Sequence, residues 1–322
     1  MPLRRLSLVL LLCGPCPTSA GVLPAANLAP QHLLHLSPGA DVPEVLTVGA
    51  TSLALDTAYA SVITDQRRGD DEARLDMEVA RIGLRWARGL GHRLEAGVEV
   101  PWLWLGGGRF DHAITGYHRA LGFPNSDRDS VGANEFGYRI SVDGRRYAPA
   151  GGAGFGDAVV GLKWVPPADA SAWGLRGFLK LPTGDPDRGL GSGRADGSAG
   201  ILGRVEGSTL RLCGTLDALF LGGTPNPALR LGTHWAAAAT AAAGAEVGWS
   251  TEAVVQLSYV ASPYATGLDE VDRDVLLLAV GARGPESGRI TWAAGFTEDL
   301  VTHSSPDFGL FLSLEGRFGG TP

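Results

Sequence analysis

Hydrophobic and polar residues alternate along most of this chain with a period of two. In residues 92–105, one set of alternate positions is apolar from Leu94 to Trp104, while the other set includes Arg93, Glu95 and Glu99. This pattern predicts β-strands with one apolar face, because successive side chains of a strand point to opposite sides. Most of the stretches run 10–15 residues, which is long enough for a tilted strand to cross a bilayer. The twelve stretches are 46–62, 72–86, 92–105, 155–165, 172–181, 195–206, 208–221, 229–246, 251–260, 273–283, 288–298 and 307–318.

The connections between these stretches alternate between long and short. The longer set comprises 64–71, 106–154, 182–194, 222–228, 261–272 and 299–306. The shorter set comprises 87–91, 166–171, 206–208, 247–250 and 284–287. A transmembrane barrel has long outer loops and short periplasmic turns in alternation. The sequence therefore predicts an all-β protein, a transmembrane antiparallel up-and-down barrel of about twelve strands over residues 46–318. A secreted all-β protein is the alternative.

Two stretches fit the alternation less well than the others. The pattern in 72–86 slips near Ala80, where we expect a β-bulge. The run from Ala236 to Ala243 is rich in alanine, a strong helix former. A short helix within 229–246 would change the strand count.

The polar faces of the predicted strands are expected to line the lumen of the barrel. Acidic and basic side chains occur there in similar number. They either pair into a closed interior or border a narrow wet channel without a strong ion preference. The lumen-lining candidates are Arg85, Arg93, Glu95, Glu99, Lys163, Arg176, Lys180, Arg211, Asp217, Glu252 and Arg317.

Two segments without alternation are candidates for closing this lumen. The connection 106–154 is long enough to have a function of its own, and we expect it to lie outside and to fold into the mouth. Residues 21–38 are apolar and interrupted by prolines. We expect residues 21–45 to form a periplasmic plug segment, with a loosely held tail as the alternative. The candidate constriction residues of the long loop are Tyr117, His118, Asp127 and Asp129.

The two ends of the chain carry the patterns of export and assembly. Residues 1–20 combine Arg4 and Arg5 with an apolar run and a small-residue site that ends at Ala20, which predicts a secretory signal peptide. A buried N-terminal helix is the alternative. The last predicted strand closes on Phe318, the expected barrel signal, and 319–322 form a tail. We expect the bacterial outer membrane as location, with its lipid and the barrel-assembly machinery as partners.

Composition excludes several other classes of protein. The chain has 322 residues, of which 44% are hydrophobic and 19% charged. The apolar content is too high for a disordered chain. Beyond the first dozen residues, no apolar run is long enough to predict a spanning helix. The formal net charge of −7 argues against nucleic-acid binding, which uses a basic face.

No group of residues matches a complete catalytic or metal-site pattern, and we expect no cofactor. His303 and Ser305 have the spacing of a base and a nucleophile, but no group that would orient the histidine lies nearby in the sequence. Asn125, Asp127 and Asp129 alternate as calcium ligands can, without the glycine and glutamate of an EF-hand. Cys213, the one cysteine outside residues 1–20, fits a buried apolar position better than a nucleophile.

Three short motifs resemble one protein family. They are Leu23-Pro-x-x-Asn27-x-x-Pro30, Gly116-Tyr-His-x-Ala-Leu-Gly-x-Pro-Asn125 and Leu181-Pro-Thr-Gly-Asp-Pro186. As a set they are similar to the proteobacterial family known as domain of unknown function 3187, over most of the chain after residue 20. The resemblance implies an exported outer-membrane β-barrel and no known activity.

Three functions follow as alternatives. The first is passive or gated passage of a small solute along the charged lumen. The second is a sealed structural or adhesive barrel that displays its outer loops. The third, which we rank last, is a membrane lipid hydrolase that uses His303 and Ser305, because their spacing resembles that of the outer-membrane phospholipase.

Overall fold

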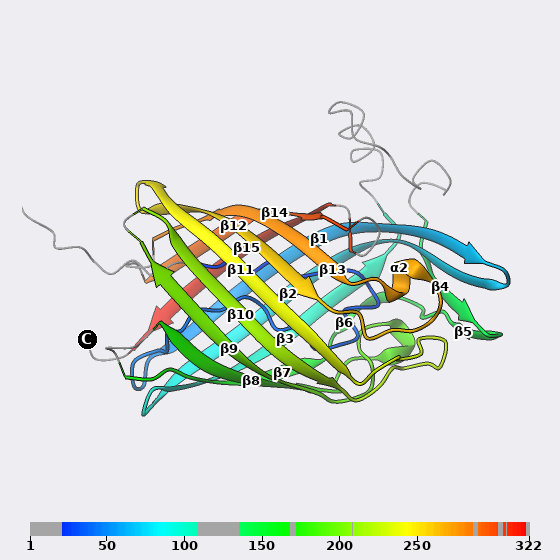
Figure 1. Cartoon of the computed structure of the whole chain (residues 1–322), viewed down its shortest axis with the longest axis horizontal. Helices are drawn as coiled ribbons and strands as arrows, with labels where there is room; N and C mark the ends of the chain where they lie inside the picture. Colours follow the sequence, from blue (N-terminus) through cyan, green and yellow to red (C-terminus); the bar gives the residue numbers. More distant parts are fainter. Residues whose placement is uncertain are drawn as a thin grey trace, which may run out of the picture.

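The computed structural model describes residues 21–108, 135–167, 172–207, 209–285, 289–301, 305–306 and 308–319. Its fifteen strands join in one antiparallel sheet, which closes on itself because β1 pairs with both β2 and β15 (Figure 1). The strands are β1 (Thr51–Arg68), β2 (Asp71–Gly91), β3 (Leu94–Gly106), β4 (Gly137–Val142), β5 (Arg145–Tyr147), β6 (Gly152–Phe155), β7 (Ala158–Trp164), β8 (Trp173–Leu181), β9 (Asp196–Glu206), β10 (Arg211–Leu221), β11 (Trp235–Gly248), β12 (Thr251–Val260), β13 (Val275–Arg283), β14 (Ile290–Asp299) and β15 (Phe308–Phe318). The short helices are η3 (Pro186–Arg188) and α2 (Asp269–Asp272).

The wall of the barrel consists of twelve strands that pair in sequence order, with β6 and β7 counted as one. Strands β6 and β7 both pair with β3 and are two halves of one wall strand. Strands β4 and β5 form a hairpin that pairs with one end of β2 and adds no strand to the closed wall. The predicted up-and-down barrel is therefore confirmed. The alanine-rich run is strand, since Ala236–Ala243 pair with β10 throughout.

The two ends of the barrel differ. We call the end with the short turns the inner end and the other the outer end. At the inner end, two-residue turns join β2 to β3 and β11 to β12. Both central residues of each turn have positive φ: His92 (50°), Arg93 (63°), Trp249 (52°) and Ser250 (56°), as type I′ hairpin turns require. The outer end carries the β4–β5 hairpin, η3 and α2 (Figure 1). Arg93 consequently lies in an exposed turn rather than in the lumen, which corrects its prediction.

The bulge expected near Ala80 is absent. The ladder between β1 and β2 runs without a shift from Arg68 opposite Asp71 to Thr51 opposite Arg88. The pattern slips because the apolar residues change sides: Leu84 points outward, whereas Leu75 points inward. The outer halves of β1 and β2 therefore enclose an apolar core at the outer end instead of facing lipid.

The strand bounds also shift two predicted segments. Strand β1 begins at Thr51 and extends to Arg68, so residues 46–50 belong to the N-terminal segment rather than to the wall. The first outer connection shrinks to Gly69 and Asp70. No helix in the part of the chain that the structure describes is long and apolar enough to span a membrane.

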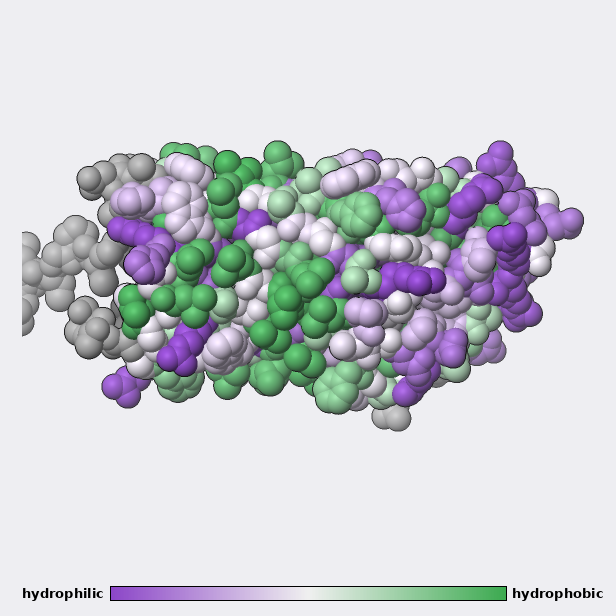
Figure 2. All heavy atoms as spheres, turned by 90° about the horizontal axis from the view of Figure 1, so that it is seen from below, coloured by the Kyte–Doolittle hydropathy of each residue, from purple (hydrophilic) through white to green (hydrophobic). Residues whose placement is uncertain are grey.

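The outside of the wall carries a belt of exposed apolar side chains. Figure 2 shows hydrophobic residues over the body of the molecule and hydrophilic residues gathered at the outer end. Such a belt is the surface that a membrane barrel presents to lipid. Its members include Leu53, Leu55, Ile82, Leu84, Leu175, Leu179, Leu212, Leu216, Leu257, Leu310, Leu312 and Leu314.

Candidate functional site

Residues 21–50, which we call the N-terminal segment, run up and down inside the barrel (Figure 1). Gly21 begins at the inner end, where its N–H donates to Glu252 of β12 at 3.0 Å. The segment turns in the outer half, where the Tyr264 hydroxyl donates to the carbonyl of Gln31 at 2.6 Å. It returns to the inner end, where the N–H of Gly49 donates to the carbonyl of Gly89 at 2.9 Å. The lumen is therefore occupied along its length by the chain's own N-terminal residues.

The most deeply buried charges of the wall hold residues 30–36 of this segment, which we call its tip. Lys180 of β8 is 2% exposed, and its ammonium donates to the carbonyl of Leu34 at 2.8 Å and to Asp157 at 2.6 Å. It also lies 3.3 Å from Asp196 of β9. The Asp196 carboxylate accepts the N–H of Leu36 at 2.9 Å. Burial of an ammonium is tolerable only with such a full set of partners, so wall and tip depend on each other.

A second buried pair contacts the returning half of the N-terminal segment. The guanidinium of Arg176 on β8 donates twice to Asp217 of β10, at 3.0 and 2.5 Å. Its Nη1 also donates to the carbonyl of Gly39 at 2.7 Å. Planar, two-bonded arginine–carboxylate pairs are among the stronger hydrogen-bonded contacts in proteins. This pair therefore joins β8 to β10 on the inward face of the wall, next to the N-terminal segment.

Further contacts fix the segment as it approaches the inner end. Lys163 of β7 donates to Asp41 at 3.1 Å and lies 3.2 Å from Glu95 of β3. The other Glu95 oxygen accepts the N–H of Leu46 at 2.8 Å. Arg204 of β9 pairs with Glu44. From Leu36 to Leu46, the polar contacts of the returning half with wall side chains therefore fall on β3 and β7–β9, whereas Gly49 bonds to Gly89 of β2 at the inner end.

Strands β15, β1 and β2, which adjoin β3 in the closed wall, carry charge pairs of their own. Arg85 of β2 pairs with Asp56 of β1, and Arg81 pairs with Glu99 of β3. Arg317 donates to Glu315 of β15 at 2.9 Å. A cavity of about 670 Å³ lies alongside the N-terminal segment and is lined by it together with residues of β15, β1, β2, β3, β7, β8 and β11–β14. A volume of this size is in the range of small-molecule sites.

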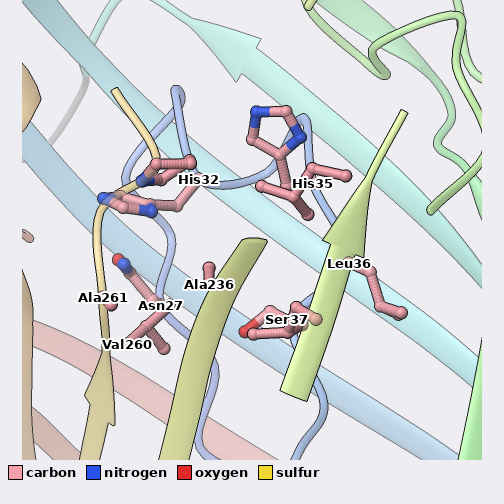
Figure 3. Close-up of a pocket in the computed structure, with 11 residues that line it drawn as sticks. Asn27, His32, His35, Leu36, Ser37, Ala236, Val260 and Ala261 are labelled. Atoms are coloured by element: carbon pink, nitrogen blue, oxygen red, sulfur yellow. The ribbon is translucent and has the colours of Figure 1, made fainter. Parts of the chain in front are cut away.

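The tip of the segment places two histidines in the outer half (Figure 3). The pKa of His32 is lowered to about 4, mainly by burial and also by nearby His35, against the opposing effect of Asp274. The His35 Nδ1 lies 3.6 Å from the Asp196 carboxylate. A small cavity of about 20 Å³ lies between the tip and strands β10–β12. The neutral form of His32 is therefore the one that fits the docked tip.

The connection 182–195 narrows the outer half of the lumen. Its Gly184 N–H donates to Asp157 at 2.8 Å, and the Ser192 hydroxyl accepts from Lys180 at 2.8 Å. Leu190 is fully buried in the apolar core of the outer end. Asp185 caps η3 by accepting the N–H of Asp187 at 3.0 Å. This connection folds inward, a role that its length alone did not reveal.

The register places most predicted lumen residues on the inward face. Arg176, Lys180 and Asp217 are buried there, and Cys213 packs in a cluster with Leu23, Ala242, Val254 and Phe311. The remaining inward-facing candidates are Arg85, Glu95, Glu99, Lys163, Arg211, Glu252 and Arg317. The candidate constriction residues Tyr117, His118, Asp127 and Asp129 lie outside the described residues.

Sequence reasoning missed several residues that define the site. Asp56 and Arg81 occupy inward positions of β1 and β2, so strand alternation with correct bounds would find them. Asp41 and Glu44 have no such signal, because the segment that carries them has no regular period. Of the hydrolase candidates, Ser305 is described, and its N–H donates to Asp299 at 3.1 Å, whereas His303 lies outside the described residues. Among the described side chains, no three His, Cys, Asp or Glu gather into a metal site.

Comparison with known proteins agrees with the barrel architecture. The chain matches the family described as "Protein of unknown function (DUF3187)" over residues 16–318. It is similar to the COG4313 outer membrane channel from Pseudomonas putida F1, with a TM-score of 0.57 and 15% identity over 88% of this chain and 100% of that chain. Similarity to the Ralstonia pickettii toluene transporter TbuX has a TM-score of 0.40, with 12% identity over 85% and 90%. At such identities the likeness shows the fold alone. No curated protein matches the chain.

Proposed function

Because the chain belongs to the DUF3187 family, whose description carries no activity, we propose its function from its own interior. The protein is an outer-membrane channel for a small solute, held closed in this structure by the N-terminal segment. The observation that carries the proposal is the cavity that remains in the lumen beside that segment. Residues 36–46 are held by side chains of β3 and β7–β9, while a cavity of about 670 Å³, which β15, β1 and β2 also line, remains alongside the segment.

The charges that border this cavity support passage of a solute without a strong ion preference. Arg81, Arg85 and Arg317 are each paired with a carboxylate of the wall. Paired charges largely cancel one another's field, and selectivity for one sign of ion needs a ring of like charge. We therefore expect a polar or weakly amphipathic small solute rather than a specific ion.

Opening the path requires movement of the N-terminal segment and leaves the wall intact. The segment is no part of the β-ladder between β1 and β15. Apart from the backbone hydrogen bonds of Gly49 and Ala50 to Gly89 at the inner end, its links to the wall strands and to the Tyr264 loop are side-chain hydrogen bonds and ion pairs, together with buried leucines such as Leu23 and Leu34. Such contacts can break and re-form without unfolding the barrel.

Single-channel recording in planar bilayers tests the proposal. The refolded chain without residues 1–20 is compared with the same chain that also lacks residues 21–45. We expect rare or small steps from the first and larger, sustained steps from the second. The control is a deletion of residues 319–322, which we expect to leave conductance unchanged. Silence from both channels, in protein shown to be folded by heat-dependent gel mobility, contradicts the proposal.

A sealed barrel with a structural or adhesive role is the second candidate. The observation that favours it is the burial of Lys180, Arg176 and Asp217 in the lumen with complete sets of partners. If that function is the true one, neither the chain without residues 1–20 nor the chain that also lacks residues 21–45 conducts. The function then depends on what the outer loops bind.

A further inference from the structure

The first residues of the N-terminal segment fit a dedicated site on β12. Three consecutive inward-facing residues of this strand, Glu252, Val254 and Gln256, contact them in order. Glu252 accepts the N–H of Gly21 at 3.0 Å. Gln256 accepts the N–H of Leu23 at 2.9 Å and donates to its carbonyl at 3.2 Å. Val254 packs with the buried Leu23 side chain. The strand thus recognises backbone and side chain within a stretch of three residues.

Gly21 is suited to this site by having no side chain. A Cβ built on it would overlap the side chain of Arg283, which lies on the neighbouring strand β13. Arg211 and Arg283 lie 3.5 and 3.8 Å from the Glu252 carboxylate and hold it in position. The site therefore accepts a glycine with its nitrogen directed at a carboxylate.

The sequence places the expected signal-peptide cleavage directly before this glycine. Hydrolysis of the Ala20–Gly21 bond by signal peptidase consumes one water and leaves a carboxylate on Ala20 and an amine on Gly21. An α-amine is largely protonated at neutral pH, and a charge-assisted bond to a carboxylate is stronger than an amide bond to the same acceptor. Capture of an N-terminal amine is a known mode of peptide recognition.

We infer that Glu252, Val254 and Gln256 form a receptor for the chain's own new N-terminus, the free α-ammonium of a Gly-x-Leu sequence. Cleavage of the signal peptide creates the group that the receptor binds. Docking of the N-terminal segment is thereby coupled to maturation. This inference goes beyond channel function, since it holds equally for a barrel that never conducts.

Cys213 provides a built-in reporter for the docked state. It faces the lumen from β10 and packs with Leu23 in one buried cluster. It is also the one cysteine that remains once residues 1–20 are removed. The rate at which a small thiol reagent modifies Cys213 therefore measures how often the first residues leave their site.

The decisive variant inserts two glycines between Ala20 and Gly21. Gly21 then keeps an N–H that can donate to Glu252, but the ammonium moves two residues away. We expect Cys213 modification to speed up about tenfold or more. The same two glycines inserted at the exposed Gly69–Asp70 turn are the matched control and leave the rate unchanged. Intact mass and N-terminal sequencing establish where each mature chain begins, and the unaltered chain is expected to begin at Gly21.

A charge-removing variant tests the partner of the ammonium. Glu252→Gln keeps an oxygen acceptor but lacks the negative charge, so we expect acceleration similar to that of the insertion. Combining the two changes adds little, because both remove the same interaction. The inference is overturned if the unaltered protein begins at another residue, or if the insertion leaves Cys213 as protected as before. Conductance plays no part in either outcome, so failure here and failure of the channel proposal are distinguishable.

Discussion

Lys180 of β8 donates from its ammonium to the carbonyl of Leu34, which lies 146 residues earlier in the chain, at 2.8 Å. The same ammonium bonds to Asp157 and lies beside Asp196. One buried cation thus ties the tip of the N-terminal segment to two wall strands. This relationship couples docking of the tip to the buried charges of the wall, and the first prediction follows from it.

Replacing Lys180 with methionine is expected to destabilise the folded barrel by about 3–5 kcal/mol, because Asp157 and Asp196 are left buried without their cation. Unfolding by urea in lipid vesicles measures the loss. Lys163→Met is the comparison, since Lys163 also joins the segment to the wall but through partners that are more exposed. A loss no larger than that of Lys163→Met contradicts the role assigned to Lys180.

Two carboxylates of the lumen are expected to differ in their importance for stability. Asp217→Asn removes the partner of Arg176, which is buried, and should cost about 3–5 kcal/mol. Asp56→Asn removes the partner of Arg85, whose side chain is 42% exposed, and should cost about 1 kcal/mol or less, since solvent screens such pairs. Denaturant unfolding of both variants provides the comparison, and equal losses would contradict the difference in burial.

Docking of the segment tip is expected to weaken in acid. The docked pKa of His32 is about 4, below its ordinary value of 6.5. The undocked form therefore takes up the proton first. Docking is unaffected above pH 6.5, weakens as the pH falls towards 4, and levels off below that. The total loss is about 3 kcal/mol. The charged groups around the tip are Asp274, Asp196 and Lys180, with His35 as a second titratable neighbour.

The rate of Cys213 modification by a reagent that also attacks the protonated thiol measures this pH dependence. His32→Gln is expected to flatten the profile between pH 6.5 and 4, whereas Ser37→Ala, a change at an exposed position two residues beyond the same turn, leaves it unaltered. A profile that stays steep in His32→Gln assigns the response to another group.

The change of sides along β2 predicts opposite behaviour of two leucines. Leu75→Ala leaves a hole in the apolar core of the outer end and should cost about 2–5 kcal/mol. Leu84→Ala removes a side chain that is 49% exposed on the lipid belt and should cost well below that, because lipid fills the space. Unfolding in vesicles gives both values. If Leu84→Ala is the more damaging change, the assignment of faces is wrong.

Strand alternation proved informative because every wall residue of a barrel faces either lipid or lumen. It predicted the twelve wall strands and the inward set that includes Arg176, Lys180 and Asp217. It was wrong at Arg93, because this residue belongs to the two-residue turn between β2 and β3 and not to a strand. It was also wrong at Ala80, because the surroundings of β2 change there while its register does not.

The course of residues 21–50 and the inward fold of 182–195 came only from the tertiary structure. Neither segment has a period, so no local pattern encodes its path. Their places are set by partners far along the chain, such as Glu252 for Gly21 and Asp157 for Gly184. The sequence by itself determined a barrel with a charged interior, because alternation is a local property. Which charges hold the N-terminal segment, and where a cavity remains beside it, depends on contacts that form only when the barrel closes around it.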